Sequence, residues 1–250
     1  PTEVVDHLVK GQVKRHLVTI AEGITMAQIS ELLESLGIVE GEAFLQKTRS
    51  PLLITSLGLS DLAGPSLEGF LFPETYHLVK EMDPEEVIRM MVHQFKKVFS
   101  QDLMEKASRM GISAREALTL ASIIERETPQ AEEKPLVSAV FHNRLKRKIP
   151  LQSDPTVIYG IEGFNGNLTR ADLLKATPYN TYLFTGLPPT PICNPGKDSL
   201  AAALNPADVP FLYFVSRNDG SHFFSTDLDE HNMAVWKYQK SPRKNHLTKK

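Results

Sequence analysis

The sequence has one cysteine, no long apolar run and almost no net charge. Because Cys193 is alone, the chain cannot form an internal disulfide. No stretch approaches the roughly 18 consecutive apolar residues that span a bilayer. The 28 basic and 30 acidic side chains leave a formal charge of −2, which argues against a nucleic-acid partner, since phosphate binding needs a clustered basic excess. Glycine-rich phosphate loops and internal repeats are also absent, which argues against nucleotide-loop and solenoid proteins.

The sequence contains the elements of an α+β fold. Its 250 residues, 41% of them hydrophobic, suit one or two ordinary globular domains. A β-favouring run at 17–20 precedes a capping box made by Thr25 and Gln28, which predicts a helix start. The glycine- and proline-rich segment 56–65 reads as a linker. We therefore expect a small N-terminal module with a short leader (1–63), a larger domain (64–240), and a basic tail (241–250) that is disordered.

The larger domain is expected to mix helices with a few short extended segments. Residues 70–79 read as a bent extended stretch, and Asp83 caps the helix that follows it. The sequence Asn218-Asp219-Gly220 between two β-favouring runs predicts a hairpin. Between them, residues 150–195 show prolines, tyrosines and asparagines without periodicity, and an irregular stretch of this length is more often functional than a simple connection.

Two glutamates end an otherwise apolar helix, at Glu125 and Glu127. At about 100° per residue they point about 200° apart, so they cannot both face one cleft. Measured from Ile124, the centre of the expected buried arc, Glu127 is the nearer of the two. A carboxyl in the last helical turn, partly buried, has a raised pKa and can donate a proton near neutral pH. The alternative is an ordinary solvated helix end.

A second group of candidate residues lies in the proline-punctuated loops. Amide, hydroxyl and aromatic side chains of this kind suit a sugar, because polar groups pair with hydroxyls while tyrosine faces cover apolar sugar patches. The alternative is an ordered loop region whose tyrosines pack as core. The candidates for substrate binding are Gln152, Asp154, Tyr159, Tyr179, Asn180 and Tyr182.

Several separate motifs, in order, resemble the MltG (YceG-like) endolytic murein transglycosylase family. They lie at residues 67–76, 121–128, 141–145, 152–160, 179–189 and 222–232. The resemblance implies a LysM-like module before a catalytic domain, and one N-terminal helix that anchors the protein in the bacterial inner membrane with this chain in the periplasm. It also implies cleavage of nascent peptidoglycan between N-acetylmuramic acid and N-acetylglucosamine, which leaves 1,6-anhydromuramyl ends. Peptidoglycan synthases are the implied protein partners.

The resemblance also implies a role for Glu127, which falls on the catalytic glutamate of the motif. The pair Glu127-Thr128 is similar to the Glu-Ser pair of other lytic transglycosylases. Glu125 is the runner-up. A lytic transglycosylase needs only one carboxyl, which first protonates the glycosidic oxygen and then deprotonates the sugar's own 6-hydroxyl. The resemblance includes the substrate-binding candidates named above. Two alternatives stay open: a glycan-binding scaffold, and a hydrolytic muramidase that pairs Glu127 with Asp154, although Asp154 could merely cap a turn.

The remaining chemistry-bearing residues suggest no further site. His222 and His231 lack the spacing of a zinc protease motif, so no metal and no cofactor are expected. Cys193 has no histidine nearby in the sequence and is expected to be inert. Arg144 lies in a family-like stretch, but its place in the run 144–148, rich in lysine and arginine, predicts a solvated helix end.

Overall fold

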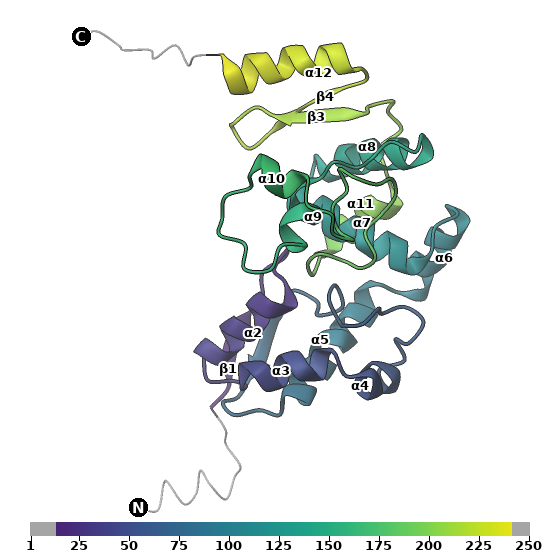
Figure 1. Ribbon diagram of the computed structural model, residues 1–250. Helices are drawn as coiled ribbons and strands as arrows, with labels where there is room; N and C mark the ends of the chain where they lie inside the picture. The colour runs from purple at the N-terminus through teal and green to yellow at the C-terminus, as the bar shows by residue number, and fades with distance from the viewer. Residues whose placement is uncertain (1–13, 242–250) are drawn as a thin grey trace, which may run out of the picture. The chain divides into compact units, whose positions relative to one another are not determined.

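The computed structural model describes residues 14–241, which pack into two units (Figure 1). The N-terminal unit is the chain up to Arg115 together with Thr190–Gly196, and the C-terminal unit is Glu116–Pro189 with the residues from Lys197 onward. The predicted leader (1–13) and most of the predicted tail (242–250) lie outside the described residues. None of the helices between residues 14 and 241 has the length and apolar character that crossing a membrane requires.

The N-terminal unit is built around a two-stranded antiparallel sheet. Strand β1 (His16–Thr19) pairs with β2 (Thr75–Leu78), so that Leu17 lies opposite His77. The helices of the unit are α2 (Met26–Ser35), α3 (Gly41–Thr48), α4 (Pro51–Ser56), α5 (Pro84–Val98) and α6 (Gln101–Arg109). Because β2 lies beyond residue 63, the packing divides the chain at a different place from the expected boundary, and residues 14–63 share one unit with 64–115.

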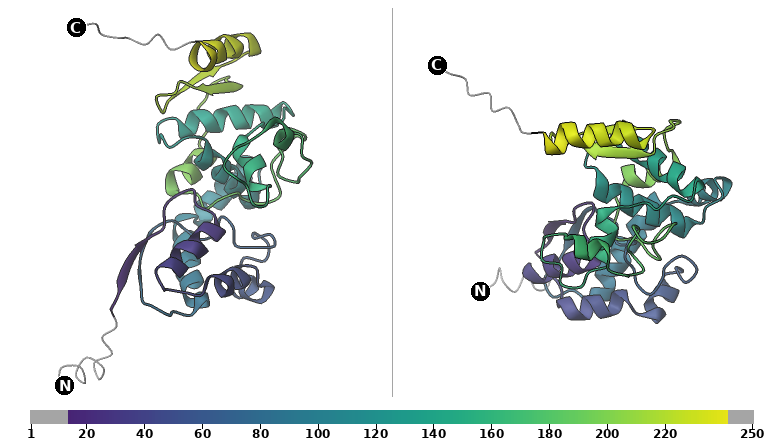
Figure 2. Two further views of the ribbon diagram at one scale, coloured as in Figure 1. Left: turned by 60° about the vertical axis from the view of Figure 1, so that its left-hand side comes forward. Right: turned by 45° about the horizontal axis from the view of Figure 1, so that its top comes forward.

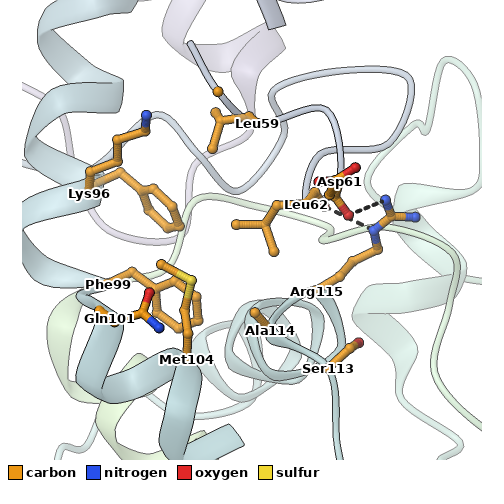
Figure 3. A pocket seen from close by; sticks show the side chains of 12 residues that line it. Leu59, Asp61, Leu62, Lys96, Phe99, Gln101, Met104, Ser113, Ala114 and Arg115 are labelled. Atoms are coloured by element: carbon orange, nitrogen blue, oxygen red, sulfur yellow. Dashed lines mark hydrogen bonds between the residues drawn. The ribbon is translucent and has the colours of Figure 1, made fainter. Parts of the chain in front are cut away.

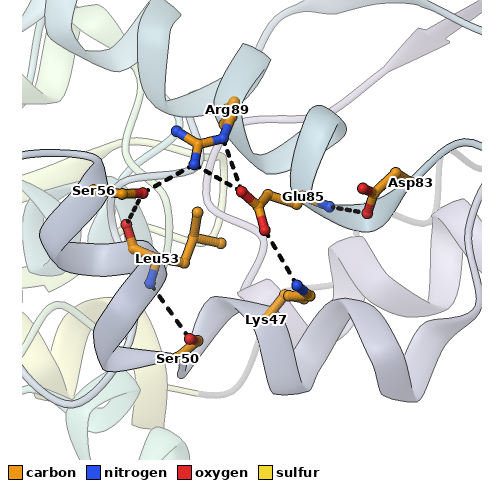
Figure 4. A network of polar contacts seen from close by, with 7 residues as sticks. All are labelled: Lys47, Ser50, Leu53, Ser56, Asp83, Glu85 and Arg89. Atoms are coloured by element: carbon orange, nitrogen blue, oxygen red, sulfur yellow. Dashed lines mark hydrogen bonds and ion pairs between the residues drawn. The ribbon is translucent and has the colours of Figure 1, made fainter.

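Local signals explain where the helices of this unit begin. The capping box predicted for Thr25 and Gln28 is present, and Asp83 caps α5 by accepting from the Glu85 amide. A network of polar side chains then ties α3, α4 and α5 together (Figure 4). In it, Glu85 accepts from Lys47 at 3.1 Å and from Arg89 at 2.7 Å. The network lies at the surface and pairs the Glu85 carboxylate with two cations.

A short returning segment, Thr190–Gly196, belongs to the N-terminal unit, and Asn194 bonds it to that unit. Asn194 is fully buried, and its Oδ1 accepts from the amides of Gly69 at 3.0 Å and Leu71 at 2.9 Å. Its Nδ2 donates to Glu68 at 3.1 Å. A buried amide that makes these bonds leaves no unmet polar group, so it fixes the segment in place.

An apolar cavity of about 850 Å³ lies within the N-terminal unit (Figure 3). Its walls include Phe99, Met104 and Leu62, which the figure shows pointing toward one another. Arg115 closes one side by donating to backbone carbonyls, among them that of Leu62 at 2.9 Å. The predicted linker 56–65 is therefore an ordered part of this unit.

The C-terminal unit surrounds one buried helix, α7 (Ala114–Glu127). Eight consecutive residues of α7, 117–124, are buried, so the helix has no solvent-facing side along this length. The expectation of a one-sided buried arc centred on Ile124 is therefore wrong. Helix α8 (Lys134–Lys146) contributes Phe141, whose ring meets Phe214 edge-on with centroids 6.0 Å apart. Burying each such side chain stabilises the fold by roughly 1.5–3 kcal/mol.

The predicted hairpin is present at the end of the C-terminal unit. Strands β3 (Tyr213–Ser216) and β4 (His222–Ser225) pair antiparallel, and Asn218 in the turn has the left-handed φ of 63° that asparagine tolerates. Helix α12 (Leu228–Val235) lies along the hairpin and continues into the π-helical η1 (Trp236–Lys240), as Figures 1 and 2 show. The other helices are α9 (Asp154–Tyr159), α10 (Arg170–Leu173) and α11 (Lys197–Leu204).

Candidate active site

The two glutamates at the end of α7 have different surroundings. The carboxylate of Glu125 accepts from the Lys134 ammonium at 3.0 Å. Both side chains of this ion pair are buried, at 7% and 4% exposed. Each charge in this pair partly offsets the cost of burying the other. Glu125 therefore joins α7 to α8 through this ion pair.

Glu127 instead lines a polar cleft of about 430 Å³ in the C-terminal unit. Its Oε1 accepts from the Ser153 hydroxyl at 2.5 Å. Burial raises the pKa of Glu127 to about 7, with the charge of Asp154 adding to the effect, while the Ser153 hydrogen bond and the charges of Arg144 and Arg126 oppose it. At neutral pH a substantial fraction of the molecules therefore carry a proton on this carboxyl.

The loop before α9 brings Ser153 to Glu127. Ser153 occupies the N-cap position of α9 but makes no side-chain cap bond, so its hydroxyl is directed to the carboxyl. Its amide donates to Thr181 Oγ1 at 3.1 Å. Gln152, one residue earlier, has a left-handed φ of 52° and donates its amide to the Thr181 carbonyl at 3.0 Å. A non-glycine residue held in this strained conformation is a feature found at functional sites.

Arg144 supports the same loop from the side of α8, and the expectation that it is solvated is wrong. The side chain is buried, and its guanidinium donates to the carbonyl of Leu151 at 2.9 Å and to that of Leu212 at 2.7 Å. It also reaches the side-chain oxygen of Gln152 at 3.3 Å. Arg144 thus joins α8 to the loop at Leu151 and Gln152 and to the segment at Leu212. The charge pattern of the sequence does not reveal this role.

Asp154 and Tyr182 form a second polar pair in the cleft. The Tyr182 hydroxyl donates to Asp154 Oδ1 at 2.6 Å. Burial is the largest cause of the raised pKa of Tyr182, and this hydrogen bond is the next. The phenol therefore stays protonated. Both residues line the cleft together with Glu127 and Gln152, so the structure brings together three of the six substrate-binding candidates.

The other three candidates do not line this cleft. Asn180 is fully buried; its Nδ2 donates to backbone carbonyls and its Oδ1 accepts from the Tyr182 amide at 3.0 Å. Asn180 therefore holds the backbone of Tyr182 in place without lining the cleft itself. Tyr159 and Tyr179 pack edge-to-face with ring centroids 4.9 Å apart. Their neighbour Gly160 is closely packed, since a Cβ there would lie 2.7 Å from Thr177 Oγ1 and 3.1 Å from Tyr179 Cβ.

Sequence reasoning missed the hairpin side of the cleft. Strands β3 and β4 and helix α12 contribute residues to it, namely Phe214, Val215, Ser216, His222, His231 and Val235. The ring of His231 stacks on Tyr213 at 5.2 Å, and burial together with the charge of Arg144 lowers its pKa. Between residues 14 and 241, no three metal-ligating side chains gather. The motif at 222–232 was the available signal, but nothing in it indicates which side chains face the cleft.

The chain is similar to known proteins over nearly its whole length. An endolytic murein transglycosylase of Bacillus subtilis is 33% identical over 236 residues, which are 88% of this chain and 64% of that protein. An endolytic murein transglycosylase of Streptococcus pneumoniae serotype 2 is 30% identical over 240 residues, which are 87% of this chain and 43% of that protein. The chain thus spans less than two thirds of each relative.

The fold is similar to a solved structure as well. A YceG-like protein of Listeria monocytogenes matches with a TM-score of 0.79 and 30% sequence identity, over 93% of this chain and 80% of that one. This match confirms the α+β class predicted from the sequence. The sequence profile of the YceG-like family matches residues 1–237, which confirms the resemblance seen in the motifs. The chain belongs to the YceG-like family.

Proposed function

We propose that the chain is the catalytic part of an endolytic peptidoglycan lytic transglycosylase. Its reaction cleaves the β-1,4 bond between N-acetylmuramic acid and N-acetylglucosamine of nascent strands and leaves 1,6-anhydromuramyl ends. The single observation that carries the proposal is a carboxyl, Glu127, that lines a polar cleft and whose pKa is raised by burial to about 7. The names of the relatives from Bacillus subtilis and Streptococcus pneumoniae support the same activity.

The proposed mechanism uses Glu127 twice. In the first step the protonated carboxyl gives its proton to the glycosidic oxygen as the bond from that oxygen to the anomeric carbon breaks. In the second, the 6-hydroxyl oxygen of the same muramyl residue bonds to the anomeric carbon, and its proton passes to the Glu127 carboxylate. The carboxyl is thereby restored and no water is consumed. A pKa near the working pH suits a group that must both donate and accept a proton.

The surrounding residues have supporting roles in this proposal. Ser153 donates to the Glu127 carboxylate and so stabilises the charged form that follows the first step. Asp154, whose negative charge helps to raise the pKa of Glu127, stabilises positive charge that develops at the anomeric carbon. Gln152 and Tyr182 bind sugar hydroxyls. The Tyr159 and Tyr179 pair covers a sugar face outside the cleft, and Asn180 acts only through Tyr182.

The presence of Asp154 in the same cleft also supports a second candidate function, hydrolysis by a muramidase that uses both carboxyls. The two reactions differ in their products. Uncross-linked glycan strands incubated with the chain and analysed by mass spectrometry are expected to yield anhydro ends, lighter by one water than reducing ends. Reducing ends would instead establish hydrolysis, and intact strands would indicate a glycan-binding scaffold.

The remainder of the chain is part of the same proposal. We infer that the β1, α2, α3 and β2 elements form the LysM-like module, because two antiparallel strands flank helices there, and that the module binds glycan. Peptidoglycan is the substrate, so the reaction takes place outside the cytoplasm. Single-pass anchoring in the inner membrane beside peptidoglycan synthases rests on the family resemblance alone.

A further inference from the structure

His222, on strand β4, is held in a fixed orientation by a carboxylate from another element. Its Nδ1 lies 2.6 Å from Glu133 Oε2, and its amide donates to Glu133 Oε1 at 2.8 Å. Both side chains are nearly buried, at 11% and 13% exposed. Glu133 precedes α8 at the N-cap position but makes no side-chain cap bond there. Its carboxylate is used for the histidine instead.

The hydrogen bonds of Glu133 determine which ring nitrogen of His222 carries the hydrogen. Glu133 accepts from the His222 amide and also from the Thr128 hydroxyl, at 3.4 Å. A carboxylate that accepts from its neighbours also accepts from the imidazole, so Nδ1 donates. In the neutral ring the other nitrogen, Nε2, is then a hydrogen-bond acceptor.

The Nε2 atom of His222 has no hydrogen-bonding partner among residues 14–241. His222 lines the cleft that also contains Glu127, and the ring is confined by Phe214, edge-on with centroids 5.5 Å apart, and by Phe224 at 6.4 Å. Within residues 14–241, Glu133 is the hydrogen-bonding partner of this side chain and it takes Nδ1. The imidazole is therefore held in place at the wall of the cleft with an acceptor nitrogen to spare, the arrangement that preorganised sites use.

We propose that His222 binds a hydroxyl group of the sugar that occupies the cleft beside Glu127, by accepting its hydrogen at Nε2. Glu133 is the positioning residue that fixes the tautomer. A hydroxyl suits this nitrogen because its O–H bond rotates to meet a fixed acceptor, whereas a carboxylate offers no hydrogen. This inference rests on the proposed function for the identity of the ligand as a glycan.

Two substitutions separate substrate binding from a purely structural role. In His222→Asn the short amide reaches the place of Nδ1 and keeps the bond to Glu133, but the group at Nε2 is lost. In His222→Gln the longer amide reaches the place of Nε2 and offers an acceptor there, but the bond to Glu133 is lost. If the pair merely anchors the hairpin, the asparagine variant behaves as wild type and the glutamine variant melts earlier.

The experiment measures glycan binding in a background without turnover. Uncross-linked glycan strands are titrated into Glu127→Gln, Glu127→Gln/His222→Asn and Glu127→Gln/His222→Gln, and the thermal unfolding of each is recorded. We expect the asparagine substitution to weaken Kd about tenfold with little change in melting temperature, because a paired polar group is lost. The glutamine substitution should weaken Kd less. Equal Kd values for the asparagine variant and its parent would overturn the inference.

Steady-state kinetics of the single His222 variants add a second readout. The asparagine variant should lower kcat/KM about tenfold, and the glutamine variant should recover part of that loss. The products of the wild-type chain test the proposed function separately. If the wild-type chain released no anhydro ends but the Kd values still separated the two variants, the proposed function would fail while the inference about His222 would stand.

Discussion

Two clusters of charged side chains, one in each unit, shift the pKa of a glutamate in opposite directions. In the N-terminal unit the hydrogen bonds from Arg89 and Lys47 lower the pKa of Glu85. In the C-terminal unit burial raises the pKa of Glu127 to about 7. The first cluster neutralises its carboxylate at the surface (Figure 4). The second leaves its carboxyl in a cleft, with Asp154 adding negative charge. The first arrangement suits a stabilising ion pair, and the second is the one that the proposed proton transfer needs.

The largest expected effect is on turnover, from Glu127→Gln. The substitution keeps the size of the side chain and an acceptor for Ser153 but removes the transferable proton, so kcat should fall about 10²- to 10⁴-fold. Measurement of anhydro-end release gives the value. In the wild type, kcat/KM should also decline as the pH rises through about 7, the pKa of the donor. A loss of less than tenfold would contradict the assignment.

The second effect is on stability, from Glu125→Gln. This substitution leaves Lys134 charged and buried, which costs about 3–5 kcal/mol of unfolding free energy, and denaturant unfolding measures the loss. The matched control is Glu125→Gln/Lys134→Met, which removes both charges and should recover much of the stability. Turnover per folded molecule should stay close to wild type. If Glu125→Gln folded normally but were inactive, the roles of the two glutamates would be reversed.

The third effect links catalysis and stability, because the raised pKa of Glu127 lowers the free energy of unfolding. The folded chain binds this proton more tightly than the unfolded chain, so stability falls as the pH rises from about 4.5 to about 7. Above this window the cost is about 2 kcal/mol, allowing for water in the cleft. Glu127→Gln should therefore be more stable than wild type at pH 8 and equal to it at pH 4. Denaturant unfolding at the two pH values checks the sign.

Local sequence signals predicted many helix starts and turns, whereas the strand pairing depends on residues far apart in the chain. The Thr25 capping box and the turn at Asn218 depend on neighbouring residues and were predicted correctly. The pairing of β1 with β2 joins Leu17 to His77, and no local pattern specifies such a partner. The domain boundary expected at residue 63 lies between these two strands, because local composition does not indicate that they pair.

The candidate site shows the same division. The sequence favoured Glu127 over Glu125 by its angle from a one-sided buried arc, but α7 is buried on all sides from 117 to 124, so no such arc exists to separate them. What separates them in the structure is Lys134, nine residues from Glu125. The roles of Arg144 and His222 likewise depend on backbone carbonyls and on a carboxylate from other segments. The assignment of Glu127 as the catalytic residue stays a prediction.

The smallest expected effect comes from the surface network, through Glu85→Gln. The folded pKa of Glu85 is lowered, so its ion pairs add stability at neutral pH, and this stability is lost as the pH falls through that value. The melting temperature of the variant should lie slightly below wild type at pH 7, and the difference should vanish in acid and in about 1 M salt, because exposed pairs are screened. The buried Glu125 pair should keep its effect in the same salt. If salt removed both effects equally, the contrast between surface and buried carboxylates in this chain would be wrong.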